Sequence, residues 1–245
     1  MRNYYIDLLC YHILPLSVKI SLLFFLKDKH YFTLSKQNED KIDKNISKIK
    51  VLSDDFNLNK VIPFLNANNL LYLKIKSRVS LMIINSDFDL SSFVNLQKLS
   101  IDSIKFTNKS LFDVFIKGMD NLTNLRSFSF CNIYVENYTN SGIDIIEKLQ
   151  FFTLLNKLLL STKNAGEFEH FCKQMSYLPC LSKLICRTEV YNDETYKVIL
   201  KYGKQFEKIR YLSIYGTGGV KALNILGFKE IIKNCVFKTI YSINY

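Results

Sequence analysis

The chain has 245 residues, of which 48% are hydrophobic, and a formal net charge of +11. Glycine and proline are scarce, at 8 and 3 residues, which disfavours both a turn-rich all-β fold and a disordered chain. The basic residues are almost all lysine rather than arginine, the better reader of bases and phosphates. We therefore expect a generally basic surface, and not a nucleic-acid site.

Residues 1–45 differ from the rest of the chain. Their apolar run from Ile13 to Leu26 is too short to span a bilayer, and Asp7 and Lys19 disfavour a secretory signal. We therefore predict no transmembrane span and a cytoplasmic or nuclear protein. The alternative is a cleaved signal peptide, which would make the protein secreted. A charged connector over residues 36–45 ends this region.

Apolar residues in this first region have the spacing of short helices. They are Leu14, Pro15, Leu22, Leu26, Tyr31 and Leu34. The pattern resembles the first two-thirds of an F-box, which implies that these six residues dock onto a Skp1-type adaptor of a ubiquitin ligase. It departs from that family at Ser17, where an acidic residue is usual, and it lacks the later tryptophan-containing part. The alternative is a helical cap over the repeats that follow.

From residue 46 onward one eight-residue phrase occurs seven times. It has apolar residues at positions one, four and six, and a small or turn-forming residue at position eight. The phrases begin 24 to 30 residues apart, at Ile46, Leu70, Leu96, Leu125, Leu155, Leu181 and Ile209. This period is typical of a solenoid. Alternating apolar and polar residues within each phrase predict a half-buried strand.

The segments between the phrases predict helices. Asn108 or Thr107 caps the first, and Ser141 caps the second. The expected helices end near Met119 and Leu149, followed by helices over Ala165–Met175, Asp193–Tyr202 (ended by Gly203) and Val220–Ile232. The segment from Ser77 to Leu96 is less helical, and a last strand is expected over Val236–Ile243. Strands that alternate with helices predict a parallel sheet in an α/β fold.

This organisation resembles the leucine-rich repeat family, closest to its longer, ribonuclease-inhibitor-like members, over residues 46–245. The resemblance implies a solenoid of seven repeats and a C-terminal capping repeat, curved into a horseshoe with a parallel sheet on its concave side. The asparagine or cysteine usual at position nine is missing. Hydroxyls one place earlier, such as that of Ser103, are expected to satisfy backbone groups of the turns instead.

Positions three, five and seven of the phrases are predicted to face outward on the concave side and to form ladders across neighbouring strands. They carry eight basic residues and one acid, with tyrosines at both ends. We predict that this surface binds a protein partner with an acidic segment, with the tyrosines as anchors. A merely solvated lysine face is the alternative. The predicted partner-binding residues are Lys48, Lys50, Tyr72, Lys74, Lys76, Lys98, Asp102, Lys157, Lys183, Arg187, Tyr211 and Tyr215.

No catalytic or metal-binding pattern emerges from the sequence. None of the six cysteines forms a C-x-x-C pair, and the three histidines lie at no metal-ligand spacing. The glycines between Gly216 and Gly219 lack the spacing of a phosphate-binding loop. We expect a protein that is not an enzyme and needs no metal or cofactor. It is either a substrate-recognition subunit of an SCF-type ubiquitin ligase or a plain repeat scaffold.

Overall fold

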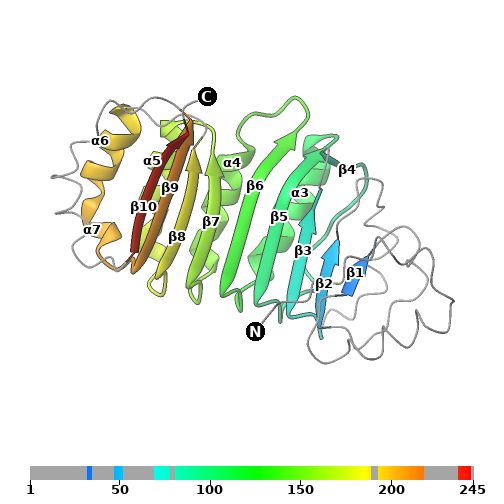
Figure 1. Cartoon of the computed structure of the whole chain (residues 1–245). Helices are drawn as coiled ribbons and strands as arrows, with labels where there is room; N and C mark the ends of the chain where they lie inside the picture. The colour runs from blue at the N-terminus through cyan, green and yellow to red at the C-terminus, as the bar shows by residue number, and fades with distance from the viewer. Residues whose placement is uncertain are drawn as a thin grey trace, which may run out of the picture.

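The computed structural model describes residues 32–34, 47–51, 69–77, 81–188, 193–217 and 237–243. They form an α/β structure on one parallel sheet that does not close (Figure 1). The strands lie side by side in chain order, except that the strand Met82–Ile84 pairs only with the strand Lys98–Phe106. The helices between residues 109 and 174 lie along one face of the sheet, behind the strands in Figure 1, and the next two helices lie to the left of the last strand. We call the other face the open face.

The elements have the following bounds. The strands are β1 (Phe32–Leu34), β2 (Lys48–Val51), β3 (Tyr72–Lys76), β4 (Met82–Ile84), β5 (Lys98–Phe106), β6 (Ser127–Val135), β7 (Lys157–Thr162), β8 (Lys183–Thr188), β9 (Tyr211–Thr217) and β10 (Phe237–Ile243). The α-helices are α3 (Lys109–Gly118), α4 (Ser141–Lys148), α5 (Ala165–Gln174), α6 (Asp193–Lys201) and α7 (Gly203–Phe206). Short 3-10 turns follow three of them: η4 (Met119–Asn121), η5 (Leu149–Phe151) and η6 (Met175–Tyr177).

Strand pairing places equivalent positions of successive phrases side by side. The third position, for example, runs from Lys48 through Tyr72 and Lys98 to Tyr211. The described side chains at the fourth and sixth positions are at most 2% exposed, and they are Ile49, Leu73, Ile75, Leu99, Ile101, Phe128, Phe130, Leu158, Leu160, Leu184, Cys186 and Leu212. The prediction of an α/β fold with a parallel sheet is confirmed.

A second row of buried residues, which was not predicted from the sequence, precedes the strands. From the third phrase onward, one such residue lies three residues before the start of each phrase. Its members are Phe93, Leu122, Phe152, Leu178 and Phe206, each at most 1% exposed. The N–H of the phrase's first residue donates to the carbonyl of this residue at 2.9 to 3.2 Å. These tight turns place the side chains of the second row in the core, between the helices and the first residues of the strands.

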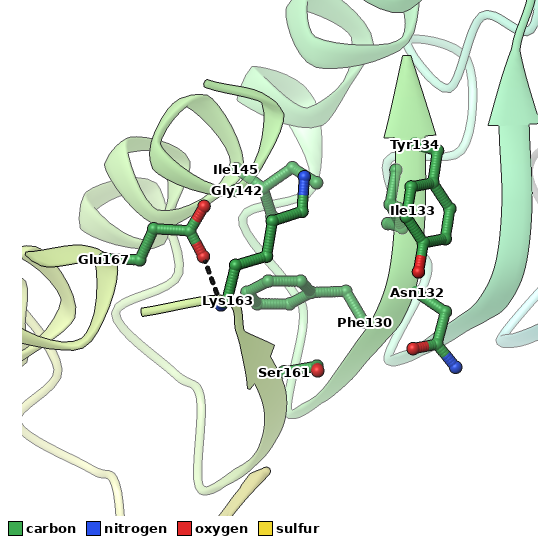
Figure 2. A pocket seen from close by; sticks show the side chains of 9 residues that line it. All are labelled: Phe130, Asn132, Ile133, Tyr134, Gly142, Ile145, Ser161, Lys163 and Glu167. Atoms are coloured by element: carbon green, nitrogen blue, oxygen red, sulfur yellow. Dashed lines mark hydrogen bonds between the residues drawn. The ribbon is translucent and has the colours of Figure 1, made fainter. Parts of the chain in front are cut away.

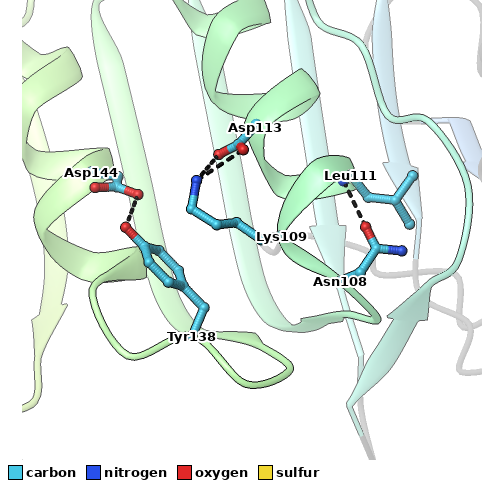
Figure 3. Close-up of polar contacts among 6 residues, drawn as sticks. All are labelled: Asn108, Lys109, Leu111, Asp113, Tyr138 and Asp144. Atoms are coloured by element: carbon cyan, nitrogen blue, oxygen red, sulfur yellow. Dashed lines mark hydrogen bonds and ion pairs between the residues drawn. The ribbon is translucent and has the colours of Figure 1, made fainter.

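The predicted helix cap at Asn108 is present, and Asn164, which was not predicted as a cap, starts a second helix. The side-chain oxygen of Asn108 accepts a hydrogen bond from the N–H of Leu111 at 3.0 Å, which starts α3 (Figure 3). In the same way Asn164 accepts from the N–H of Glu167 at 2.9 Å and starts α5. Each side chain satisfies a backbone donor that has no partner within the helix.

The predicted cap at Ser141 is wrong. Ser141 is the first residue of α4 and not its cap, because its hydroxyl donates instead to the carbonyl of Ile133 at 3.4 Å. The helix predicted over Asp193–Tyr202 is confirmed to within one residue as α6, and Gly203 then begins the short helix α7.

Strands β5 and β6 continue beyond the predicted phrase. Ser103 and Asn132 have φ of 61° and 52°, a left-handed conformation that interrupts the strand alternation at position eight. Past this point β4, which was not predicted as a strand, pairs with Ile104–Phe106 of β5. The hydroxyl of Ser103 donates to the Asp102 carboxylate at 3.1 Å. The expectation that it would bind backbone of the turn is therefore wrong.

One prediction near the start of the chain is wrong. Leu34, expected on a helix of the adaptor-docking region, lies in β1, which pairs with β2. The last strand, expected over Val236–Ile243, is confirmed to within one residue as β10, which pairs with β9. No helix among the described residues is long and apolar enough to cross a membrane.

Several predictions lie outside the described residues. They concern the docking residues Leu14, Pro15, Leu22, Leu26 and Tyr31, the connector over residues 36–45 and the helix over Val220–Ile232. The role in a ubiquitin ligase therefore stays a prediction from the sequence.

The end of α3 packs closely against the loop before β5. A Cβ at Gly118 would lie 2.6 Å from the backbone nitrogen of Leu90 and 2.7 Å from the Asp89 carboxylate. We predict that Gly118→Ala lowers the free energy of unfolding by about 1–3 kcal/mol, measured by urea denaturation, because backbone must move to relieve the overlap. In the control Gly166→Ala, the Cβ meets only the Asn164 side chain at 3.2 Å, so the change should stay within about 1 kcal/mol. Equal losses in both variants would contradict this account.

A hydrogen bond ties the loop after β6 to α4. The hydroxyl of Tyr138 donates to the Asp144 carboxylate at 2.7 Å (Figure 3). This bond, with smaller contributions from desolvation and nearby carboxylates, raises the pKa of Tyr138 from 10.0 to about 12. Because the folded-state pKa lies above the unfolded one, the stabilisation is complete below pH 10 and is lost as pH rises through about 12.

We therefore predict that Asp144→Asn returns the ionisation of one tyrosine toward pH 10, as measured by an ultraviolet absorbance titration of the folded protein. The matched control is Asp120→Asn, whose carboxylate pairs with Lys148 at 2.7 Å and should leave the titration unchanged. An identical titration of all three proteins would show that the Tyr138 hydrogen bond does not form.

Candidate binding surface

The open face is made of the third, fifth and seventh positions of the phrases on β2 to β9. The third positions are Lys48, Tyr72, Lys98, Ser127, Lys157, Lys183 and Tyr211. The fifth are Lys50, Lys74, Ser100, Ser129, Leu159, Ile185 and Ser213. The seventh are Lys76, Asp102 and Cys131, then Ser161, Arg187 and Tyr215. The twelve predicted residues thus lie on adjacent strands, with Lys50 and Tyr215 placed by backbone register alone.

Lysines gather around the middle of this face. Lys98 and Lys157 are exposed, and Lys74 and Lys183 are half-buried. Desolvation lowers the pKa of Lys157, and the charges of Lys183, Lys98 and Lys74 lower it further. Three lysines from different strands therefore act on one ammonium group, and the four share one region of positive potential.

Asp102 does not neutralise this region, although it is the one acid at the described positions of the open face. Its carboxylate lies 3.1 Å from the ammonium of Lys76. It also accepts hydrogen bonds from Ser103 at 3.1 Å and from the side-chain amide of Asn132 at 3.2 Å. Three local partners hold the carboxylate at the middle of β5, four residues beyond Lys98 and so away from the position-three lysines.

Tyr211 already has a neighbour on its ring. The ammonium of Lys183 lies 3.9 Å from the ring centroid, a cation–π contact. The face of the Tyr211 ring that contacts Lys183 is therefore not free to act as the predicted aromatic anchor. Tyr72, at the same position on β3, is half-buried.

Two outward positions of the phrases are buried instead. Cys131 is 3% exposed and precedes the left-handed residue Asn132, where β6 leaves the simple alternation. Burial raises the pKa of the Cys131 thiol to about 12, so the group stays neutral and acts as a packing residue. Ser213 on β9 is also fully buried. These two positions are closed to a partner.

Several residues between the lysines are not among the predicted partner-binding residues. Ser100, Ser127 and Ser129 place hydroxyls on β5 and β6, beside Lys98. Leu159 and Ile185 pair with each other on β7 and β8, and both are half-buried. Leu159 and Ile185 could have been noticed in the sequence, because they are apolar at the fifth position, where every other phrase carries lysine or serine.

A small cavity lies at the carboxyl ends of β6 and β7, where α4 and α5 begin (Figure 2). Its volume of about 20 Å³ is enough for about one water molecule. Glu167 at its wall accepts a hydrogen bond from the backbone N–H of Lys163 at 2.7 Å, and a Cβ at Gly142 would lie 2.8 Å from its carboxylate. The carboxylate therefore joins the starts of α4 and α5, and the cavity is too small for a substrate.

Within the part of the chain that the structure describes, no group of three or more histidine, cysteine, aspartate or glutamate residues is arranged to hold a metal ion. A scan against protein-family models and a search of curated proteins find no match for this chain.

Proposed function

We propose that this chain is an interaction protein of the leucine-rich repeat type, whose open face binds an acidic segment of a protein partner. Parallel strands in chain order, helices α3 to α5 on a single face and the recurring turns before the strands support the repeat interpretation. In such a fold the strand side is the concave side, and it offers adjacent strands to one elongated ligand.

The observation that carries the proposal is the uncompensated charge at the middle of the open face. Lys98 and Lys157 form no ion pair within the described residues, and Asp102 is held by Lys76. The lysines lower the pKa of Lys157, so they raise one another's free energy. An acidic segment relieves this repulsion and is also steered toward the face before contact.

The first test reverses charge at the centre of the face. We predict that Lys98→Glu with Lys157→Glu weakens binding of a fluorescently labelled polyglutamate peptide by about tenfold or more, because repulsion replaces attraction. Fluorescence anisotropy at low and at physiological salt measures the affinity. The control is Lys117→Glu with Lys173→Glu, which changes the net charge equally at exposed lysines on α3 and α5. Equal losses in the two double variants would refute binding at the open face.

The second test removes the one described acid of the face. We predict that Asp102→Asn strengthens binding of the same peptide by about two- to fivefold, because Lys76 is released and a like charge is removed. Asp113→Asn, which breaks the pair with Lys109 on α3, should leave the affinity unchanged. A purely structural role of Asp102 predicts unchanged or weaker binding, and that result would contradict the proposal.

A further inference from the structure

The open face contains an apolar pair among polar neighbours. Leu159 on β7 pairs with Ile185 on β8, and both side chains are half-buried. At the same position, β5 and β6 carry Ser100 and Ser129. Strand alternation alone predicts polar residues on an exposed face, so neither side chain is needed to complete the core.

Positive charges surround this pair. Lys157 and Lys183 precede Leu159 and Ile185 by two residues on the same strands, and Arg187 follows Ile185 by two. A step of two residues along a strand is about 6.6 Å, so each cation is an immediate neighbour of the pair on its own strand. The described strands β7 and β8 contain no acidic residue.

An apolar centre with a charged rim is the arrangement found at protein–protein interfaces, where covering the centre excludes water and gives most of the binding energy. Nucleic acids are bound differently, by cations together with aromatic or guanidinium groups on which bases stack. Leu159 and Ile185 offer no stacking surface, and the neighbouring ring of Tyr211 is already occupied by the ammonium of Lys183, 3.9 Å from its centroid. The pair therefore favours a peptide over a nucleic acid as the occupant.

We infer that the segment bound by the open face is amphipathic: its carboxylates meet Lys157, Lys183 and Arg187, and one of its apolar side chains covers Leu159 and Ile185. This inference rests on the proposed function and narrows its partner. An extended segment along β7 and β8 presents alternate side chains about 6.6 Å apart, which matches the step from lysine to apolar residue to arginine. The expected pattern is Glu-x-Leu-x-Glu.

The test compares two labelled peptides of equal length and charge, built from repeats of Glu-Ser-Leu-Ser-Glu or of Glu-Ser-Ser-Ser-Glu. Fluorescence anisotropy with the full chain should show about tenfold tighter binding of the leucine peptide, since one buried leucine contacts both apolar residues. Leu159→Ser with Ile185→Ser should abolish that preference and keep the affinity for the serine peptide. Leu154→Ser with Leu200→Ser changes two residues that are each 44% exposed elsewhere, and should keep the preference.

The outcomes separate the inference from the proposed function. Equal binding of both peptides to the unmodified protein, with loss on Lys98→Glu and Lys157→Glu, would overturn the inference and leave the proposed function standing. Binding of neither peptide would overturn both. Displacement of the leucine peptide by oligodeoxythymidylate at equal concentration, with no effect of Leu159→Ser and Ile185→Ser, would overturn the choice of a peptide. Circular dichroism and thermal unfolding of each variant confirm that it is folded.

Discussion

A backbone carbonyl at the second position of each of the first six phrases holds the sheet in register. The carbonyl of Gln97 accepts hydrogen bonds from the N–H groups of Arg126 and Ser127, at 2.8 and 3.0 Å. Arg126 does the same for the next strand, and Asn156 for the one after that. A slip of one residue would turn every apolar side chain of a strand out of the core. The order of the open face depends on this contact.

The same register concentrates like charge. Side chains that are distant in sequence, such as Lys157 and Lys183, become neighbours because their strands are paired at fixed positions. The core on the other side of the sheet, filled by leucine, isoleucine and phenylalanine, supplies the stability against which this repulsion is tolerated. Asp102 does not neutralise the charge of the lysines on β7 and β8, because its carboxylate is already bound by Lys76, Ser103 and Asn132.

Much of the fold was predictable because apolar spacing is a local property of the sequence. Leu99 and Ile101 alternate with polar residues as a half-buried strand requires, and the period between phrases predicts parallel strands with connecting helices. The errors occur where spacing carries no information. The left-handed conformations of Ser103 and Asn132, the pairing of β4 with the end of β5 and the strand at Leu34 depend on contacts with other segments.

The binding surface divides in the same way. The sequence alone determines that these lysines lie on one face of the sheet. The alternation of apolar and polar residues within each phrase, and the period between phrases, assign each lysine its position. Only the tertiary structure decides which of those positions are accessible and what neighbours them. Cys131 is buried and inaccessible, the ring of Tyr211 contacts the ammonium of Lys183, and Leu159 lies beside Ile185 with cations around the pair. These properties arise from contacts between strands, and a pattern read along one strand does not contain them.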